Sequence, residues 1–105
     1  MATVLGLAND YLMTNTKRMD LDRRIRAIPS DKIDCKDILM GEMATVVEDL
    51  NNAVIRLAAV RSTNTDEMRT KAMVMIDMRD CDAMAPALVA LGVSLAEDVA
   101  KLEAS

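Results

Sequence analysis

The side chains of this chain best suited to chemistry are arginines, which gather in the basic segment of residues 17–26. Arginine binds phosphate through paired hydrogen bonds, and a basic helix can follow a nucleic-acid backbone. Two acids, Asp20 and Asp22, interrupt the segment, and the whole chain carries a formal charge of -4. Because like charges repel, this balance disfavours nucleic acid and anionic membranes as partners. The candidate anion contacts are Arg18, Arg23, Arg24 and Arg26.

The same segment has a second interpretation, in which its charges serve the protein fold. Asp20 with Arg24 and Asp22 with Arg26 stand four residues apart, the spacing at which side chains meet on a helix. We therefore expect a solvated helix face, or a basic strip that meets the acidic C-terminal half of this chain or of a partner. A nucleic-acid-associated regulator that uses residues 17–26 is the alternative function.

Catalysis has few suitable groups here, since the chain contains no His, the commonest general base and metal ligand. Cys35 and Cys81 lack the close spacing of a zinc site, and we expect both thiols to be buried. The aspartates within residues 31–37 and 77–82 match no calcium loop, so we expect capping or solvated carboxylates. The three glycines are scattered and form no phosphate loop. The sequence predicts no enzyme, no cofactor and no metal ion.

One enzymatic alternative does not need His. Arginine and lysine on long helices can stabilise an anionic pericyclic transition state, and in this respect the chain resembles the all-helical chorismate mutases. The pattern of basic, acidic and amide positions along the first helix of that family is absent, and Pro29 interrupts where that helix would continue. We rank this function third. The residues available for it are Arg18, Arg23, Arg24, Arg26, Arg56 and Lys71.

Methionine replaces aromatic residues in this chain, which has ten Met and a single aromatic residue, Tyr11. Methionine fills irregular gaps in a core, and it also adapts to exchangeable partner surfaces or binds soft metals. The apolar face of the second helix is wide enough to leave area uncovered, which favours a partner or self-association surface. Asn51 lies at its edge, either exposed at the rim or buried where it fixes helix register. The predicted interaction surface comprises Met40, Met43, Val47, Asn51, Val54, Met73 and Met75.

Apolar residues at helical spacing predict a first helix over residues 3–27, with a polar stretch at 14–18 where it can bend or break. Pro29 ends this helix, and Ser30 or Asp31 is expected to cap the second, over residues 31–61. At ~1.5 Å per residue, that rod is about 45 Å long. We therefore expect the molecule to be elongated.

The polar segment 61–67 contains a helix stop and a helix start, where Asn64 and Glu67 have the offset of a capping box. Such a short linker predicts that the second and third helices are antiparallel neighbours. A second long member then covers residues 65–102. We expect a break or kink between Asp80 and Pro86, because proline disrupts a helix interior.

These elements predict one all-α domain over residues 1–105, an antiparallel hairpin or bundle of three to four helices that completes its core by dimerisation. The longest apolar run, residues 83–96, is shorter than the ~20 residues of a membrane span, and the N-terminus lacks the features of a signal peptide. We therefore expect a cytoplasmic protein.

Residues 58–72 read as a helix end, a Thr-containing turn and a second helix with a Lys-Ala step. This segment resembles short uncharacterised helical-hairpin proteins of bacterial and phage genomes. The resemblance implies a helical hairpin and carries no function with it. From the residues, we predict a small interaction or regulatory protein whose partner is a second copy or another helical protein.

Overall fold

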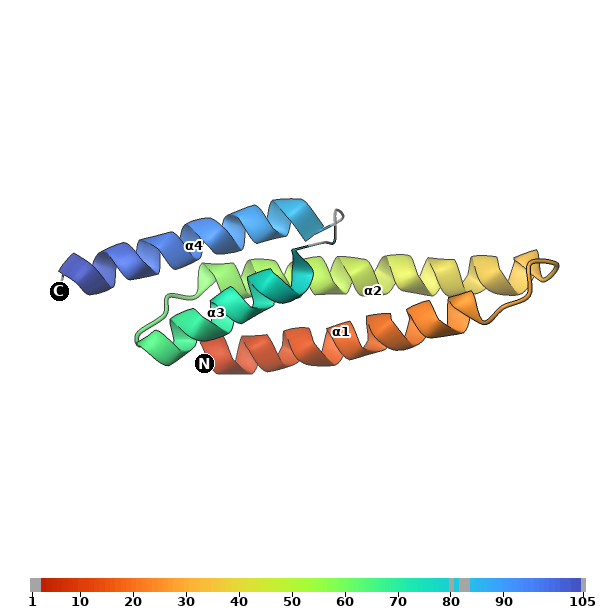
Figure 1. Ribbon diagram of the computed structural model, residues 1–105, viewed down its shortest axis with the longest axis horizontal. Helices are drawn as coiled ribbons and strands as arrows, with labels where there is room; N and C mark the ends of the chain where they lie inside the picture. The colour runs from red at the N-terminus through yellow and green to blue at the C-terminus, as the bar shows by residue number, and fades with distance from the viewer. Residues whose placement is uncertain (1–2, 80, 82–83, 105) are drawn as a thin grey trace.

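Four α-helices make up most of the computed structural model, which describes residues 3–79, 81 and 84–104, with side chains up to residue 101. They are α1 (Val4–Arg26), α2 (Ile33–Ala59), α3 (Thr65–Met78) and α4 (Ala85–Ala104). The described residues contain no strand. Their arrangement is elongated, with extents of 60 × 25 × 16 Å (Figure 1). The predicted all-α class is confirmed.

Helix α1 begins at a side-chain cap, because Thr3 Oγ1 accepts a hydrogen bond of 3.0 Å from the Gly6 N–H. The helix continues without a break through residues 14–18, where sequence reasoning allowed one. Here Thr14 and Thr16 donate their hydroxyls to the carbonyls of Asp10 and Leu12, at 2.9 Å each. These threonines therefore bond within the helix that they would otherwise disrupt.

Helix α2 starts later than predicted and without a side-chain cap. Its N-cap is Lys32, whose side chain makes no capping hydrogen bond, so the expected cap at Ser30 or Asp31 is wrong. The reason lies in the preceding turn, where the Lys32 N–H donates to the Pro29 carbonyl at 3.0 Å and delays the first helical residue.

Helix α3 has the predicted cap at Asn64, whose Oδ1 accepts from the Glu67 N–H at 2.9 Å. The Glu67 carboxylate turns back to Thr63, accepting from its N–H at 2.8 Å and from its hydroxyl at 2.6 Å. These hydrogen bonds from Thr63 hold the pKa of Glu67 below its ordinary value. The predicted cap at Asn64 is confirmed. In a capping box the glutamate accepts from the N–H of the N-cap residue, whereas here Glu67 accepts from the N–H of Thr63, one residue earlier.

The helices pack in a different order from the one predicted. α1 and α2 lie side by side in opposite directions, while α3 packs on α1 and α4, and α4 packs on α2 and α3 (Figure 1). The expectation that the second and third helices pack as neighbours is therefore wrong. Val60 is extended, with φ -100° and ψ 129°, so residues 60–64 carry the chain away from α2 before α3 begins.

The long member predicted over residues 65–102 is also wrong, because α3 and α4 are separate helices that run in opposite directions (Figure 1). The predicted break at residues 80–86 includes residues 80, 82 and 83, which lie outside the described part of the chain. Pro86 falls in the first turn of α4, where the missing N–H of proline is tolerated.

The hydrophobic core lies at the end of the molecule where all four helices meet. Tyr11, the largest of its buried side chains, comes from α1 and donates its hydroxyl to Asp77 Oδ2 of α3 at 2.5 Å. At the opposite end of the molecule, the end of α1 and the start of α2 lie beside each other (Figure 1). The core residues are Val4, Leu7, Tyr11, Leu50, Ala53, Val54, Leu57, Val74, Met78, Met84, Ala87 and Leu91.

Candidate interaction surface

Residues 17–49 form a two-helix arm that projects beyond α3 and α4 (Figure 1). Within the arm, Leu21 is the only buried side chain. Its α2 part nevertheless carries many apolar residues, of which Ile33, Ile38 and Met40 are 63%, 66% and 53% exposed. Apolar residues gathered on one exposed element indicate a site of association.

Two heptad stripes run along α2, and they differ in what covers them. The inner stripe faces α1, since Val46 lines a groove together with Leu21 and Arg24 of α1. Burial along it increases from half-buried residues in the arm to fully buried ones in the core. The inner stripe comprises Leu39, Met43, Val46, Leu50, Ala53 and Leu57.

The outer stripe lies beside it and comprises Met40, Ala44, Val47, Asn51, Val54 and Ala58. Its C-terminal members pack in the core with Ala87 and Leu91 of α4, because α4 lies along this half of α2. In the arm the same stripe has no helix over it: Met40 and Ala44 are exposed and Val47 is half-buried. The outer stripe is thus a docking face of which α4 covers only one half.

The seven residues predicted as one interaction surface fall in several places. Met40, Val47 and Asn51 share the outer stripe, and Asn51 is half-buried where the covered half begins. Val54 is fully buried in the core, so its place on an exposed surface is wrong. Met43 is half-buried on the inner stripe.

The remaining two methionines lie on α3, away from the arm. Met73 is 63% exposed, whereas Met75 is half-buried and its Cε lies 3.2 Å from where a Cβ on Gly92 of α4 would stand. Met75 therefore packs against α4. Sequence reasoning missed Ile33 and Ile38 on the arm, and Val89 and Val93 on the outer face of α4, all of which are more than half exposed.

The arginines of residues 17–26 are engaged by neighbours on their own helix. Arg23 pairs with Asp20 at 2.8 Å, and Arg24 reaches the same aspartate at 4.0 Å. Arg26 pairs with Asp22 at 3.1 Å, and Arg18 Nε donates to Asn15 Oδ1 at 2.8 Å. The predicted four-residue pairs are confirmed. Exposed pairs of this kind contribute about 0–1 kcal/mol, so an acid of a partner can replace the aspartate of such a pair.

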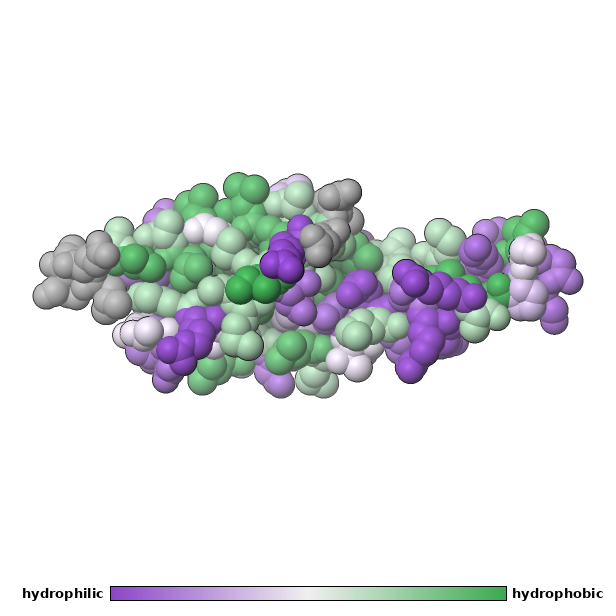
Figure 2. Space-filling view, in the orientation of Figure 1, coloured by the Kyte–Doolittle hydropathy of each residue, from purple (hydrophilic) through white to green (hydrophobic). Residues whose placement is uncertain are grey.

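This basic segment of α1 lies beside the first half of α2 and far from α4 (Figure 1). Of the alternatives for this segment, contact with the acids of α4 in the same chain is not seen among the described residues, whereas a solvated helix face agrees with the exposure of Arg23, Arg24 and Arg26. Figure 2 shows hydrophilic side chains gathered over this part of α1, with hydrophobic ones dominating at the α4 end. Within the arm, the basic segment of α1 therefore lies beside the acidic first half of α2.

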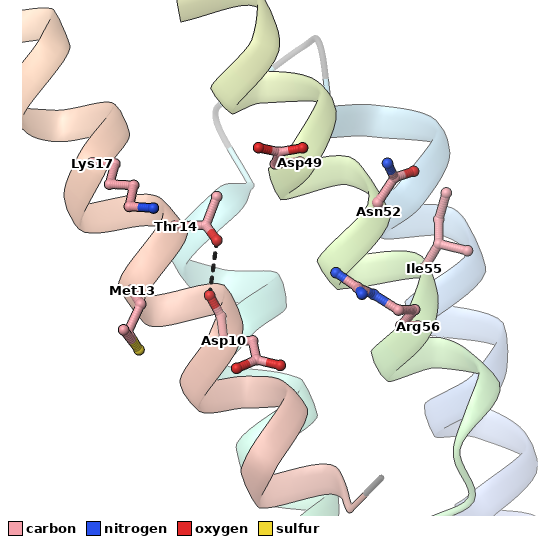
Figure 3. Close-up of a pocket in the computed structure, with 8 residues that line it drawn as sticks. All are labelled: Asp10, Met13, Thr14, Lys17, Asp49, Asn52, Ile55 and Arg56. Carbon is pink, nitrogen blue, oxygen red and sulfur yellow. Dashed lines mark hydrogen bonds between the residues drawn. The ribbon is translucent and has the colours of Figure 1, made fainter.

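A polar groove of about 680 Å³ lies between α1 and α2 near the base of the arm (Figure 3). Lys17 of α1 and Arg56 of α2 line it together with two carboxylates, Asp10 and Asp49. The two bases are offset by the two acids, so the groove has no net charge with which to attract an anion. The cationic cluster that a chorismate-mutase-like mechanism requires is not assembled in this groove.

Lys71, counted among the residues for that mechanism, is fully buried instead. Its ammonium group donates to the Val60 carbonyl at 2.6 Å, to Ser94 Oγ at 2.9 Å and to Asp98 Oδ2 at 2.6 Å. All three N–H bonds are thereby used within the fold. Burial raises the pKa of Asp98, but the hydrogen bond from Lys71 and its charge hold it below its ordinary value.

The cysteines and the acidic residues show no assembled metal site in the described part of the chain. Cys35 is exposed and Cys81 is half-buried, so the prediction of two buried thiols is wrong for Cys35. No three residues of the types His, Cys, Asp and Glu gather there to hold a metal ion. Across the described residues, no helix has the length and apolar content to cross a bilayer.

Over the residues that the structure describes, the fold is all-α, with four helices and a two-helix arm that α3 and α4 do not cover. Comparison of the chain with models of protein families, with curated proteins and with solved structures gave no match.

Proposed function

We propose that this chain is a small cytoplasmic interaction or regulatory protein without catalytic activity. It works by docking the helices of a partner, either a second copy of the chain or another helical protein. The observation that carries this proposal is the outer stripe of α2, which packs against α4 around the fully buried Val54 in its C-terminal half and is uncovered in the arm.

The energetics of helices support the proposal. Helices in water gain most of their stability by packing an apolar face, and a pair of helices covers less of each face than a bundle does. On the outer stripe, Met40 and Ala44 are exposed and Val47 is half-buried, so each would gain from further burial. Removing apolar surface from water contributes about 25 cal/mol per Å², so a partner helix on this stripe stabilises both molecules.

The site chemistry supports a binding role over an enzymatic one. The buried ammonium of Lys71 is fully hydrogen bonded, and the groove of Figure 3 combines opposite charges without a His or Cys nucleophile. Nucleic-acid binding has less support, because the arginines of residues 17–26 pair with acids of their own helix.

Light scattering coupled to size exclusion tests the proposal over ~1 μM to ~1 mM, a range that covers weak and moderate affinities. We expect the mass to rise above 11.5 kDa with concentration, or a polarity-sensitive dye to bind the arm of a monomer. A chain that stays at 11.5 kDa and binds no dye would contradict the proposal. Tight, salt-sensitive binding of nucleic acid would favour the alternative function.

A further inference from the structure

We propose that the groove between α1 and α3 is a binding site for a small primary amine. The ammonium group of the ligand pairs with Asp77, and its apolar body lies between the two helices. This amine site is lined by residues outside the arm, so it goes beyond the proposed function. Three features of the groove support the assignment: its buried floor, its single unpaired carboxylate and the exposed apolar residues at its rim.

The groove has the size and the floor of a small ligand pocket. Its volume is about 290 Å³, close to the lower end of the ~300–1,000 Å³ range of ligand pockets. It lies where α3 packs on the first half of α1 (Figure 1). Its floor is formed by side chains that the fold buries, Ala8 and Tyr11 of α1 and Val74 of α3. The site is therefore formed before a ligand arrives.

The carboxylate of Asp77 lines this groove and is fixed by α1. Its Oδ2 accepts hydrogen bonds from the Tyr11 hydroxyl at 2.5 Å and from Asn15 Nδ2 at 3.3 Å. Among the residues that the structure describes, no donor bonds the other oxygen, Oδ1, and no base forms an ion pair with Asp77. Arg18, whose charge also acts on Tyr11, donates its Nε to Asn15 Oδ1 instead. Asp77 Oδ1 is thus available to a ligand.

The polar groups of the groove select an ammonium group. The other hydroxyl of the lining belongs to Thr70, which already donates to the Asp66 carbonyl at 2.9 Å. The lining therefore offers one negative charge and no positive one, which disfavours an anion. An ammonium group carries three donors, and a hydrogen bond between ionised partners is about twice as strong as a neutral one. A primary amine can therefore use Asp77 Oδ1.

The rim of the groove favours an apolar body on this amine. Leu12 and Met73 flank the groove and are 55% and 63% exposed. A ring or short chain between them removes apolar surface of both side chains from water, and the gain is proportional to the area buried. Because methionine is unbranched and flexible, Met73 can adapt to the shape of that body.

Tyr11 reports binding directly, since it is the only aromatic residue and lies at the floor of the groove. At about pH 7 cyclohexylmethylamine is protonated, and its titration should give a saturable change in tyrosine fluorescence with a dissociation constant of about 1 mM or lower. Cyclohexylmethanol has the same body without the charge, and methylamine has the charge without the body. Both should bind at least ~3-fold more weakly, because each makes only one of the two contacts.

Asp77→Asn tests the charge. Asparagine keeps an oxygen that can accept from Tyr11 and removes the negative charge. The affinity for cyclohexylmethylamine should fall ~3- to 10-fold, a range that allows for the exposure of Asp77 to water. The affinity for cyclohexylmethanol should stay the same. Asp10→Asn is the matched control, because Asp10 is an exposed aspartate of α1 that does not line this groove.

Two threonines allow a matched test of the space. Thr70 lines the groove and Thr16 does not, yet each donates its hydroxyl to the carbonyl four residues earlier at 2.9 Å. Thr70→Leu and Thr16→Leu therefore remove the same kind of helix hydrogen bond. Thr70→Leu should fill part of the groove and weaken amine binding ~10-fold or more, whereas Thr16→Leu should leave it unchanged. Circular dichroism checks that both variants stay helical.

Each part of the assignment has an outcome that overturns it. Equal affinities for the amine and the alcohol, unchanged by Asp77→Asn, would overturn the pairing with Asp77 and leave an apolar occupant. Equal effects of Thr70→Leu and Thr16→Leu would overturn the position of the ligand in the groove. No saturable change with any probe up to about 10 mM would overturn the site itself. The proposed function is tested separately, by association of the chain.

Discussion

Lys71 Nζ of α3 lies 2.6 Å from Asp98 Oδ2 of α4, and both side chains are buried. The same ammonium bonds the Val60 carbonyl in the segment between α2 and α3. This one side chain therefore joins α3, α4 and the segment between α2 and α3. Lys71 and Asp98 are 27 residues apart in the sequence. Their ion pair adds a polar contact to the apolar packing of α3 on α4.

Removing Lys71 alone should be strongly destabilising. Lys71→Met leaves the Asp98 carboxylate buried without a counter-charge, which costs about 3–5 kcal/mol of unfolding free energy. The double variant Lys71→Met with Asp98→Leu removes both charges and should be more stable than either single variant. Urea denaturation of the four proteins measures the coupling. Additive losses would show that the two groups do not stabilise each other.

The lowered pKa of Asp98 predicts a loss of stability in acid. A carboxyl group whose pKa is lower in the folded state than its ordinary 3.8 stabilises the fold above that pH. The contribution is lost as pH falls through the folded-state pKa. The difference in unfolding free energy between wild type and Asp98→Asn should therefore shrink below about pH 4. The pKa of Glu67 is also lowered, but both proteins retain Glu67, so its contribution to the pH dependence cancels in this comparison.

Tyr11 should resist ionisation while the protein is folded. Burial, the hydrogen bond to Asp77 and the charge of Asp77 all raise the pKa of Tyr11 above its ordinary 10.0. Its contribution to stability is present below pH 10 and is lost as pH rises above it. Because Tyr11 is the only aromatic residue, tyrosinate absorbance reports it alone. Asp77→Asn should allow ionisation at lower pH, and an ordinary titration in wild type would contradict the structure.

The two helix starts with and without a side-chain cap give opposite predictions. Asn64→Ala removes the acceptor for the Glu67 N–H and should cost about 1 kcal/mol of unfolding free energy. Lys32→Ser offers a hydroxyl where α2 has no cap and should instead stabilise the protein by a few tenths of a kcal/mol or more. Thermal or urea denaturation distinguishes these signs. A loss at both positions would show that residue 32 cannot adopt cap geometry.

Local signals in the sequence predicted some helix ends and missed one. Pro29 and Asn64 act on residues within one turn of themselves, and they correctly predicted the end of α1 and the start of α3. The cap of α2 was expected at Ser30 or Asp31 and lies at Lys32. The partner of α3 depends on the direction of residues 60–64 and on Lys71. Lysine is usually exposed, and nothing within a few residues of Lys71 in the sequence indicates that its side chain is buried and paired with a carboxylate.

The candidate surface shows the same limit. Met40 and Val54 occupy equivalent positions of one heptad stripe, and the periodicity alone treats them alike. The packing of α4 on α2 distinguishes them, because Val54 packs in the core with Ala87 and Leu91 of α4, whereas Met40 is 53% exposed. Sequence periodicity therefore found the stripe, while the division between core and open surface required the tertiary arrangement.

Gly41 offers a direct test of whether the arm is open in the isolated chain. It lies in the interior of α2, and a Cβ added there would have no neighbour within 4 Å. Alanine is favoured over glycine in a helix by about 0.5–1 kcal/mol, so Gly41→Ala should raise the unfolding free energy of the monomer by that amount. Gly92→Ala should gain less, because its Cβ would meet Met75 Cε at 3.2 Å. Urea denaturation below the concentration at which the wild type associates provides the measurement. If Gly41→Ala destabilised the dilute monomer, some part of the chain would have to occupy the space beside Gly41, and the arm would not be free to receive a second copy.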